Sequence, residues 1–461
     1  MVRGQAIVIR RLETALEERT GSSSFLRATL RYVFPDHWSF LLGEIALYSF
    51  VVLIGTGTFL ALFYSPSAAE TTYHGGYEPL VGQQMTQAYA SALHLSFDVP
   101  AGLLMRQTHH WAALVFVVAI VMHLMRIFFT GAFRKPRDLN YYVGLTMLLI
   151  AVLEGYLGYS LLDDLLSGMG LAIGYSTALS MPVLGASFAT LVWDGQFPGS
   201  DAFFSRMFIT HVFILPAVLA VLITIHLVMI ARPHHTQFAD PGHTERNVVG
   251  IPMWPGYALR SVGLLLSVAG ALVLMGGLIQ INPIWLWGPY HTYEATNGAQ
   301  PDWYLGWLIG ALRLVPAFDV TIGGYTLIPN PFWGGILFPL AVFGFLFAWP
   351  SIERRVRRDR RQHNLLERPR DVPFRTAVGA AVFTFVATVF FAGAADRAFV
   401  QLGVPYETQV WIYRGLAIVL PFVAYWVTRR VCEELRAREL TFGTTSPVRR
   451  IRRGPGGGFS R

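Results

Sequence analysis

Long apolar stretches separated by shorter polar segments dominate this chain of 461 residues. An α-helix rises about 1.5 Å per residue, so about 20 apolar residues cross the roughly 30 Å hydrocarbon layer of a membrane. Eight stretches have this length and character: 39–63, 108–129, 139–161, 207–231, 257–281, 332–349, 374–394 and 408–428. The pattern predicts an all-α integral membrane protein with eight transmembrane helices.

A polar, turn-rich stretch at 232–250 divides the chain near residue 240. The long loop 282–331 follows it and contains an apolar helical pattern at 302–314, which we place on the membrane surface. We expect a cytoplasmic N-terminal segment, a four-helix unit, a second four-helix unit with the long loop, and a disordered cytoplasmic tail. Their bounds are 1–35, 36–240, 241–430 and 431–461.

Basic residues lie almost entirely on one side of the predicted membrane. The net charge is +8, although only 14% of the residues are charged. If the N-terminus is cytoplasmic and the spans alternate, the cytoplasmic segments hold 29 of the 36 Lys and Arg residues. Away from the span ends, the opposite loops hold only Arg313 and Arg397. This asymmetry follows the positive-inside rule, so we expect both termini in the cytoplasm.

Three further features limit the class of protein. The basic runs 354–361 and 449–453 suit anionic membrane lipid, and we do not expect nucleic-acid binding. The first 35 residues contain no apolar stretch typical of a cleaved signal, so we expect none. The single cysteine, Cys432, excludes an intrachain disulfide, a c-type haem attachment and a cysteine-ligated cluster within this chain.

Four histidines stand at matching depths in two of the spans. His109 and His123 are 14 residues apart, and His211 and His226 are 15 apart. At about 100° per residue, each of these spacings puts both histidines on one helix face, roughly 21–23 Å apart along the axis. Since both helices run inward, His109 lies level with His211 (the outer pair) and His123 with His226 (the inner pair). Two facing neutral imidazoles are the ligand set of a low-spin haem iron.

Other interpretations of these histidines remain open. A single histidine inside a span can be a hydrogen-bonded core residue or a proton relay. His110 rivals His109 as the outer ligand, but its spacing of 13 from His123 turns it out of line with that residue. We therefore place His110 beside the outer haem and not on its iron.

Small and basic residues accompany the histidines. The first span carries Gly43 and Gly57, and the third carries Gly144 and Gly158, so the glycines of each pair are 14 residues apart. Without side chains at these positions, both helices could approach a porphyrin. With these glycines, the first four spans form a predicted di-haem four-helix bundle. Three arginines stand at span ends where haem propionates would emerge, although each could instead be a snorkelling side chain: Arg106, Arg126 and Arg206.

One acid lies inside the third span. Glu154 stands four residues before Gly158, on the same face and about 6 Å away along the axis. A carboxyl at that depth is costly unless it is protonated, paired or hydrated, so Glu154 is a candidate for proton transfer. The alternative is a structural pair with an arginine such as Arg106.

Over about residues 30–430 the chain resembles the cytochrome b subunit of the quinol:cytochrome c reductases, the cytochrome bc complexes. The resemblance rests on the histidine and glycine spacings and on MHLMR, GYS, PDWY and LRLVP at 122–126, 158–160, 301–304 and 312–316. Five stretches are similar to the actinobacterial branch: 34–50, 109–116, 128–138, 243–250 and 281–285. This chain has Leu162 where the family often has a proline. It has Leu41 where the chloroplast type has a cysteine that holds an extra haem.

The resemblance implies an enzyme of the respiratory chain, a quinol–cytochrome c reductase and translocase, with two non-covalent b haems in this chain. A quinol, menaquinol in this branch, would be oxidised at the outer face, and electrons would cross to a quinone at the inner face. The implied partners are a Rieske-type iron–sulfur protein, a dihaem cytochrome c subunit and an aa3-type oxidase. We expect a homodimeric complex in the cell membrane.

The resemblance also implies site residues. Asp302 would accept a quinol proton and Tyr304 would position the ring, although Asp302 could instead cap the helix at 303–314. Asp36 could likewise be no more than the N-cap of the first span. The remaining quinone-site residues are Pro301, Trp303, Tyr159 and Gly170 outside and Trp38 with Asp36 inside. Two other functions remain open: a di-haem membrane anchor of another respiratory dehydrogenase, and a proton-coupled transporter.

Overall fold

The computed structural model describes residues 14, 29–195, 197–294, 301–443, 452–453 and 459–460. Nearly all of the predicted N-terminal segment before residue 29, and nearly all of the predicted tail after Gly443, lie outside the described residues.

Eight helices in the described part of the chain are long and apolar enough to cross a membrane, which confirms the predicted number. One of the eight is built from α9, a π-helical turn η3, and α10. Their bounds are α3 Leu41–Ala61, α5 Gly102–Thr130, α6 Asp138–Ser160, α9 Asp201–Ile209, η3 Thr210–Ile214, α10 Leu215–Ala231, α11 Ala258–Leu278, α13 Phe338–Arg357, α14 Pro373–Gly393 and α16 Tyr406–Gly443.

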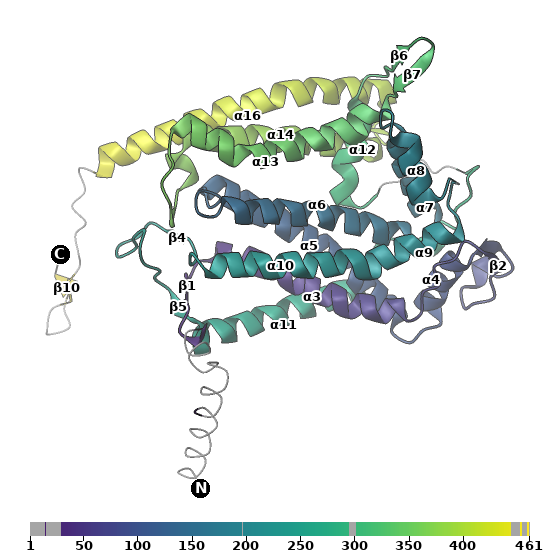
Figure 1. The fold of residues 1–461 in the computed structure, drawn as a ribbon, viewed down its shortest axis with the longest axis horizontal. Helices are drawn as coiled ribbons and strands as arrows, with labels where there is room; N and C mark the ends of the chain where they lie inside the picture. Colours follow the sequence, from purple (N-terminus) through teal and green to yellow (C-terminus); the bar gives the residue numbers. More distant parts are fainter. Residues whose placement is uncertain are drawn as a thin grey trace, which may run out of the picture.

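The spanning helices lie side by side along the long axis of the molecule (Figure 1). α3, α5, α6 and α10 form the predicted first bundle. α11, which follows the expected boundary near residue 240, packs against α3 and α5. α14 packs against α16 and also contacts α5, and α13 contacts α6. The three helices α13, α14 and α16 therefore cover the opposite side of the bundle (Figure 1).

The last helix is longer than expected. We predicted a span that ends at 428 and a disordered tail from 431, but α16 continues without a break to Gly443. Ion pairing between Arg429 and Glu433, one turn apart, supports the continuation, with Arg429 Nε 2.9 Å from Glu433 Oε1. The start of the predicted tail is therefore helical.

Shorter helices gather mainly at one end of the bundle, where α4, α7 and α8 lie in Figure 1. The helix predicted at 302–314 is present as η6 followed by α12, and its place on the membrane surface stays a prediction. The helices α4, α7 and α8 were not predicted. The shorter elements are α4 Gln87–Phe97, α7 Leu165–Leu179, α8 Gly185–Trp193, α12 Gly306–Leu314, α15 Ala395–Phe399, η1 Trp38–Phe40, η2 Glu78–Leu80, η4 Met253–Tyr257, η5 Ile284–Leu286, η6 Trp303–Leu305, η7 Trp333–Leu337 and η8 Pro369–Asp371.

Strands are short and occur only as pairs among the described residues, so the all-α assignment holds. Four pairs are antiparallel, and β4 with β8 is parallel. The pairs are β1 Val33–Phe34 with β5 Ile251–Pro252, β2 Glu70–Thr72 with β3 Gln84–Thr86, β4 Gln237–Phe238 with β8 Leu365–Leu366, β6 Val320–Ile322 with β7 Tyr325–Ile328, and β9 Arg452–Arg453 with β10 Phe459–Ser460.

Local sequence sets where several of these helices begin and end. Ser200 caps α9 by accepting a hydrogen bond from Phe203 N–H, and Asp164 forms a capping box with Ser167 at the start of α7. α5 ends at Gly131, whose φ of 67° is left-handed and therefore suits glycine. These caps fix one end each of α5 and α9, which belong to spans that carry the histidines, and of the shorter helix α7.

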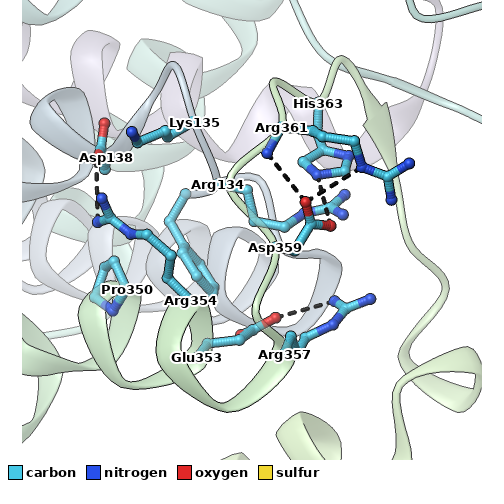
Figure 2. Close-up of a pocket in the computed structure, with 11 residues that line it drawn as sticks. Arg134, Lys135, Asp138, Pro350, Glu353, Arg354, Arg357, Asp359, Arg361 and His363 are labelled. Carbon is cyan, nitrogen blue, oxygen red and sulfur yellow. Dashed lines mark hydrogen bonds and ion pairs between the residues drawn. The ribbon is translucent and has the colours of Figure 1, made fainter.

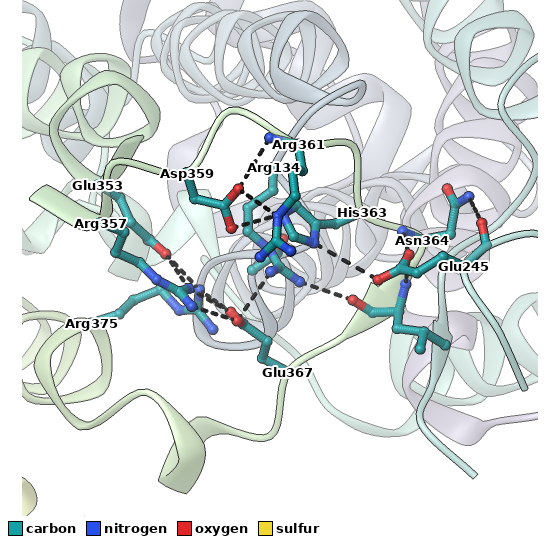
Figure 3. Close-up of polar contacts among 12 residues, drawn as sticks. Arg134, Glu245, Glu353, Arg357, Asp359, Arg361, His363, Asn364, Glu367 and Arg375 are labelled. Atoms are coloured by element: carbon teal, nitrogen blue, oxygen red, sulfur yellow. Dashed lines mark hydrogen bonds and ion pairs between the residues drawn. The ribbon is translucent and has the colours of Figure 1, made fainter. Parts of the chain in front are cut away.

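An ion-pair cluster joins the two groups of helices at the end that holds the α5–α6 connection (Figure 3). Arg375 of α14 is fully buried and lies 2.9 Å from Glu353 and 2.8 Å from Glu367. Arg134, in the α5–α6 connection, lies 3.0 Å from the same Glu367. Burial alone would raise the pKa of Glu367, but Arg357, Arg375 and Arg134 lower it to about 2. Removing one partner from such a buried pair costs about 3–5 kcal/mol.

The neighbouring surface carries further ion pairs (Figure 2). Arg354 of α13 lies 3.3 Å from Asp138, the first residue of α6, and His363 lies 3.1 Å from Asp359. The Arg354–Asp138 pair adds to the attachment of α13 to the first bundle, and the His363–Asp359 pair lies within the segment that follows α13.

Candidate functional site

The four predicted histidines meet in two facing pairs. The ring centres of His109 and His211 are 6.2 Å apart, and those of His123 and His226 are 6.5 Å apart. A metal–imidazole bond is about 2 Å long and a ring nitrogen lies roughly 1.1 Å from its ring centre, so one iron between two imidazoles needs about 6 Å. Both pairs have the spacing that a single iron requires.

The described residues contain no group of three or more His, Cys, Asp or Glu side chains that could hold a bare metal ion. Two imidazoles alone suit a metal whose other ligands come from a porphyrin. The donor set therefore fits haem iron.

The helix that carries His211 and His226 is not a regular α-helix. Residues Thr210–Ile214 form a π-helical turn, in which Leu215 N–H bonds to Thr210 C=O. A π-turn takes up one extra residue, so a spacing of 15 on this helix equals a spacing of about 14 on a regular one. The prediction treated both helices as regular, and this turn explains why unequal spacings still give level pairs.

Each predicted glycine of the four faces one histidine. A Cβ atom at Gly43 would lie 3.2 Å from His123 Cε1, and one at Gly57 would lie 3.0 Å from His109 Cε1. A Cβ atom at Gly144 would lie 3.7 Å from His226 Cε1, and one at Gly158 only 2.4 Å from His211 Cε1. Any larger residue at Gly158 would displace His211, so these glycines form a close-fitting surround for the imidazoles.

Hydrogen bonds orient the two outer imidazoles. His109 Nδ1 lies 2.9 Å from Thr56 Oγ1. His211 Nδ1 lies 3.0 Å from the carboxylate of Glu154 and 3.2 Å from its backbone oxygen. Glu154 therefore pairs with His211 and not with Arg106, the structural partner that the sequence had suggested.

The inner pair has no side-chain hydrogen-bond partner among the described residues. The Nδ1 atoms of His123 and His226 are buried and have no partner among the described residues. A buried polar atom without a partner is costly, and it marks a place where water or a ligand contributes.

The three predicted arginines differ in their surroundings. Arg106 is buried and donates to Asn282 C=O at 3.3 Å, while its Nε and Nη2 atoms have no partner in the described part of the chain. Arg126 lies over the Phe40 ring, and its Nε is likewise buried without a described partner. Arg206 has a side chain 54% exposed that lies 3.7 Å from Asp194. Arg106 and Arg126 thus keep donors for an anionic group, whereas Arg206 has a surface partner.

Asp302 lies at the centre of an outer polar group. Its Oδ1 lies 2.8 Å from His110 Nε2, and its Oδ2 accepts a 3.3 Å hydrogen bond from the Tyr304 hydroxyl. It makes no side-chain cap on the following helix, so the capping alternative is not supported. Burial, followed by the Asp302 carboxylate, raises the pKa of Tyr304 well above its ordinary value.

Other predicted outer residues lie close to this group. The hydroxyl of Tyr159 is buried and has no partner among the described residues, and it lies within electrostatic range of Asp302. A Cβ atom at Gly170 would lie 3.1 Å from the Tyr159 ring. Trp303 packs edge-on against Tyr304, with ring centres 6.1 Å apart, and follows Pro301 by two residues.

A large cavity of about 1020 Å³ surrounds the inner pair. Its volume reaches the upper end of the range for small-molecule sites, roughly 300–1,000 Å³. His123, His226 and Arg126 line it together with the predicted Asp36 and Trp38. The N-cap at this point is His37, which accepts from Ser39 N–H, so Asp36 is not the cap.

Sequence reasoning missed two buried acids directly after α6. Asp163 accepts a 2.6 Å hydrogen bond from Thr86, and Asp164 caps α7. Burial raises the pKa of Asp163 to about 7 and that of Asp164 to about 6. Adjacent acids at the end of an apolar span were the signal that could have identified them.

The fold and the two imidazole pairs define a membrane-spanning protein of the b-type cytochrome class. A family model described as "Cytochrome b(N-terminal)/b6/petB" matches residues 114–289. The chain is 42% identical to the cytochrome bc1 complex cytochrome b subunit of Streptomyces coelicolor, over 95% of this chain and 80% of the relative. It is 46% identical to the same subunit of Mycobacterium tuberculosis, over 92% of this chain and 77% of the relative. The chain belongs to the family of cytochrome bc1 complex cytochrome b subunits.

Solved structures agree with this assignment at the level of the fold. A chain of a hyperthermophilic respiratory Complex III matches with a TM-score of 0.65 and 20% identity, covering 91% of this chain and 98% of that one.

Proposed function

We propose that this chain is the cytochrome b subunit of a quinol:cytochrome c oxidoreductase, which oxidises a quinol near the outer pair and delivers electrons to a quinone near the inner pair. The observation that carries the proposal is the presence of two imidazole pairs at two levels of one bundle. Their ring centres are 6.2 Å and 6.5 Å apart, the separation at which one iron fits between two imidazoles. Its relatives are named as bc1 complex cytochrome b subunits, which supports the same function.

Two non-covalent haem b groups would supply a one-electron carrier at each level. His109 and His211 would hold one, and His123 and His226 the other, with the four facing glycines leaving room for the rings. Arg106 and Arg126 would receive propionates through their free donors. Arg206 would do so only by leaving Asp194, from which its guanidinium is 3.7 Å away.

Asp302 would accept a proton from the quinol hydroxyl at the outer site. A quinol hydroxyl is too weak an acid to ionise unaided near neutral pH, so oxidation needs a positioned base. His110, 2.8 Å from Asp302, would hold the carboxylate in place, and Tyr304 would fix the other oxygen. Pro301, Trp303, Tyr159 and Gly170 would enclose the ring. Glu154, held by His211, is the second candidate acceptor.

The cavity around the inner pair would hold the inner haem between His123 and His226 and would also receive the quinone that is reduced. Asp36 and Trp38 stand at its edge. The Asp36 side chain is 61% exposed, and Trp38 as a whole residue is 71% exposed. Arg260 lies 2.9 Å from Asp36 and gives this edge an ion pair that can face water.

The remaining parts of the proposal concern assembly and orientation. The partners would be a Rieske-type iron–sulfur protein, a cytochrome c subunit with two haems and an aa3-type oxidase, in a complex with two copies of this chain. The quinol would be menaquinol. The excess of basic residues on one side supports a cell-membrane location with both termini cytoplasmic. Release of quinol protons outside and uptake inside would contribute to the proton gradient.

The test is purification of the complex through a tag on this chain. We expect copurification of an iron–sulfur protein and haem-stained cytochrome c, and reduction of cytochrome c by a menaquinol analogue. A preparation with b-type absorbance but no quinol:cytochrome c activity would instead favour the anchor of another dehydrogenase. Absence of b-type absorbance would favour a transporter.

A further inference from the structure

A carboxyl group that the sequence did not single out lies in the wall of the inner cavity. Glu44 stands in the first turn of α3 and lines the cavity with the inner pair. Its Oε1 accepts a 2.6 Å hydrogen bond from the Tyr257 hydroxyl. Its Oε2 accepts from Ser261 at 2.9 Å and from Tyr48 at 3.1 Å. Three hydroxyl groups thus converge on one carboxyl.

The position of Glu44 follows from its neighbour. Gly43 faces His123, since a Cβ atom there would lie 3.2 Å from the imidazole. The next residue of a helix points about 100° away, so Glu44 faces α11 while it stays at the depth of the inner pair. Tyr257 and Ser261, its partners from the α11 side, line the same cavity.

The mouth of the cavity holds a different pair of charges. Asp36 and Arg260 form an ion pair there, and both side chains are 61% exposed. Asp36 already faces water and an arginine, whereas Glu44 lies eight residues further along the chain, inside the membrane-spanning segment Trp38–Ala61. A group that passes protons to a ligand inside the cavity must line that cavity away from its exposed edge, and Glu44 does so.

A purely structural role is the alternative. An acid in the first turn of a helix stabilises it by about 0.3–1 kcal/mol, and hydrogen bonds to Tyr257 and Ser261 join α3 to α11. That role does not require the carboxyl to face a cavity of about 1020 Å³ that also contains the inner pair. Ionisable groups inside membrane spans that face a cavity are commonly functional.

We propose that Glu44 is the proton donor to the quinone that is reduced in the inner cavity. The inference rests on the proposed function, which supplies the two electrons. Each proton leaves through cleavage of the Glu44 O–H bond and forms an O–H bond on one quinone oxygen. Cytoplasmic water then reprotonates the carboxylate past the Asp36–Arg260 pair, and a second transfer completes the quinol. The hydroxyls of Tyr257 and Ser261 hold the carboxyl toward the cavity.

The test compares Glu44→Gln and Glu44→Asp in the purified complex, with Glu70→Gln as control because Glu70 is an exposed acid on β2. The haems are reduced with dithionite and mixed with a short-chain menaquinone analogue, and their reoxidation is followed by stopped-flow absorbance. We expect Glu44→Gln to slow reoxidation at least roughly tenfold, the usual cost of a lost proton donor. Glu44→Asp should retain most of the rate, and Glu70→Gln should match the wild type.

Haem content distinguishes the donor role from the structural one. The proposal requires Glu44→Gln to keep both haems, because glutamine fills the same space and still accepts hydrogen bonds. Wild-type reoxidation in Glu44→Gln would overturn the assignment, and so would loss of a haem together with slow reoxidation. If quinone does not oxidise the haems of the wild-type complex, the proposed function fails instead.

Discussion

The outer and inner histidine pairs have similar spacing but different surroundings. At the outer pair, Thr56 holds His109 and Glu154 holds His211 through their Nδ1 atoms, at 2.9 Å and 3.0 Å. At the inner pair, the Nδ1 atoms of His123 and His226 lack a partner in the described chain. The inner pair also borders the cavity of about 1020 Å³.

The difference indicates that side chains of the protein orient the outer imidazoles, whereas no described side chain does so for the inner ones. A ligating histidine whose other nitrogen bonds to a carboxylate is held in one orientation and becomes a more basic ligand. The inner histidines have no such carboxylate partner among the described residues, and they line the cavity of about 1020 Å³. The predictions below test this contrast, from the largest expected effect to the smallest.

Removal of a ligand should abolish one haem and leave the other. We expect His123→Ala or His226→Ala to lose the inner haem entirely while the outer haem remains visible in a reduced-minus-oxidised spectrum. His110→Ala is the matched control beside the outer pair and should keep both haems. Loss of a haem in His110→Ala with retention in His109→Ala would mean that the ligand is His110.

Loss of the base at the outer site should affect turnover and not haem binding. Asp302→Asn keeps the shape of the side chain but cannot accept a proton, so we expect turnover to fall at least roughly tenfold. The measurement is cytochrome c reduction by a menaquinol analogue, with haem content as the control. Unchanged turnover would move the acceptor role to Glu154.

Glycine substitutions should separate the two levels. A Cβ atom at Gly158 would lie 2.4 Å from His211, but one at Gly144 would lie 3.7 Å from His226, an ordinary contact. We therefore expect Gly158→Ala to lower outer haem content severalfold and Gly144→Ala to leave inner haem content nearly unchanged. Equal losses in the two variants would show that the outer level is not the tighter one.

The smallest effect should come from the hydroxyl that orients His109. Thr56→Val removes the hydrogen bond to His109 together with the hydroxyl's bond to Val52 C=O. Loss of the bond to His109, worth about 0.5–1.5 kcal/mol, should speed release of the outer haem by about two- to tenfold. Thr58→Val is the control, because Thr58 bonds only to the backbone of Ile54 and is exposed. Identical release rates in the two variants would remove Thr56 from the account.

Much of this architecture could be predicted from the sequence. Apolar length alone identified eight spans, because the membrane sets one length for every helix. Helical spacing brought together His109 with His211 and His123 with His226, since a helix converts residue number directly into depth and direction.

The remaining features depend on tertiary contacts or on departures from regular helix. No pattern indicated the π-turn before α10, which corrects the 15-residue spacing, or the pairing of Glu154 with His211 across two helices. Glu44 carried no signal of its own, because its partners Tyr257 and Ser261 are more than 200 residues away in the sequence. The helix from 431 to Gly443 was missed because its charged composition resembles a tail.

The central claim is that each histidine pair binds one non-covalent haem b, and haem quantification of the purified chain tests it most directly. Pyridine haemochrome spectra, protein concentration and a haem-stained denaturing gel are measured on the same sample. The account predicts two b haems per chain and no haem on the denatured band, because the only cysteine, Cys432, lies in α16 away from both pairs. One haem per chain, or haem that stays bound to the denatured chain, would contradict it.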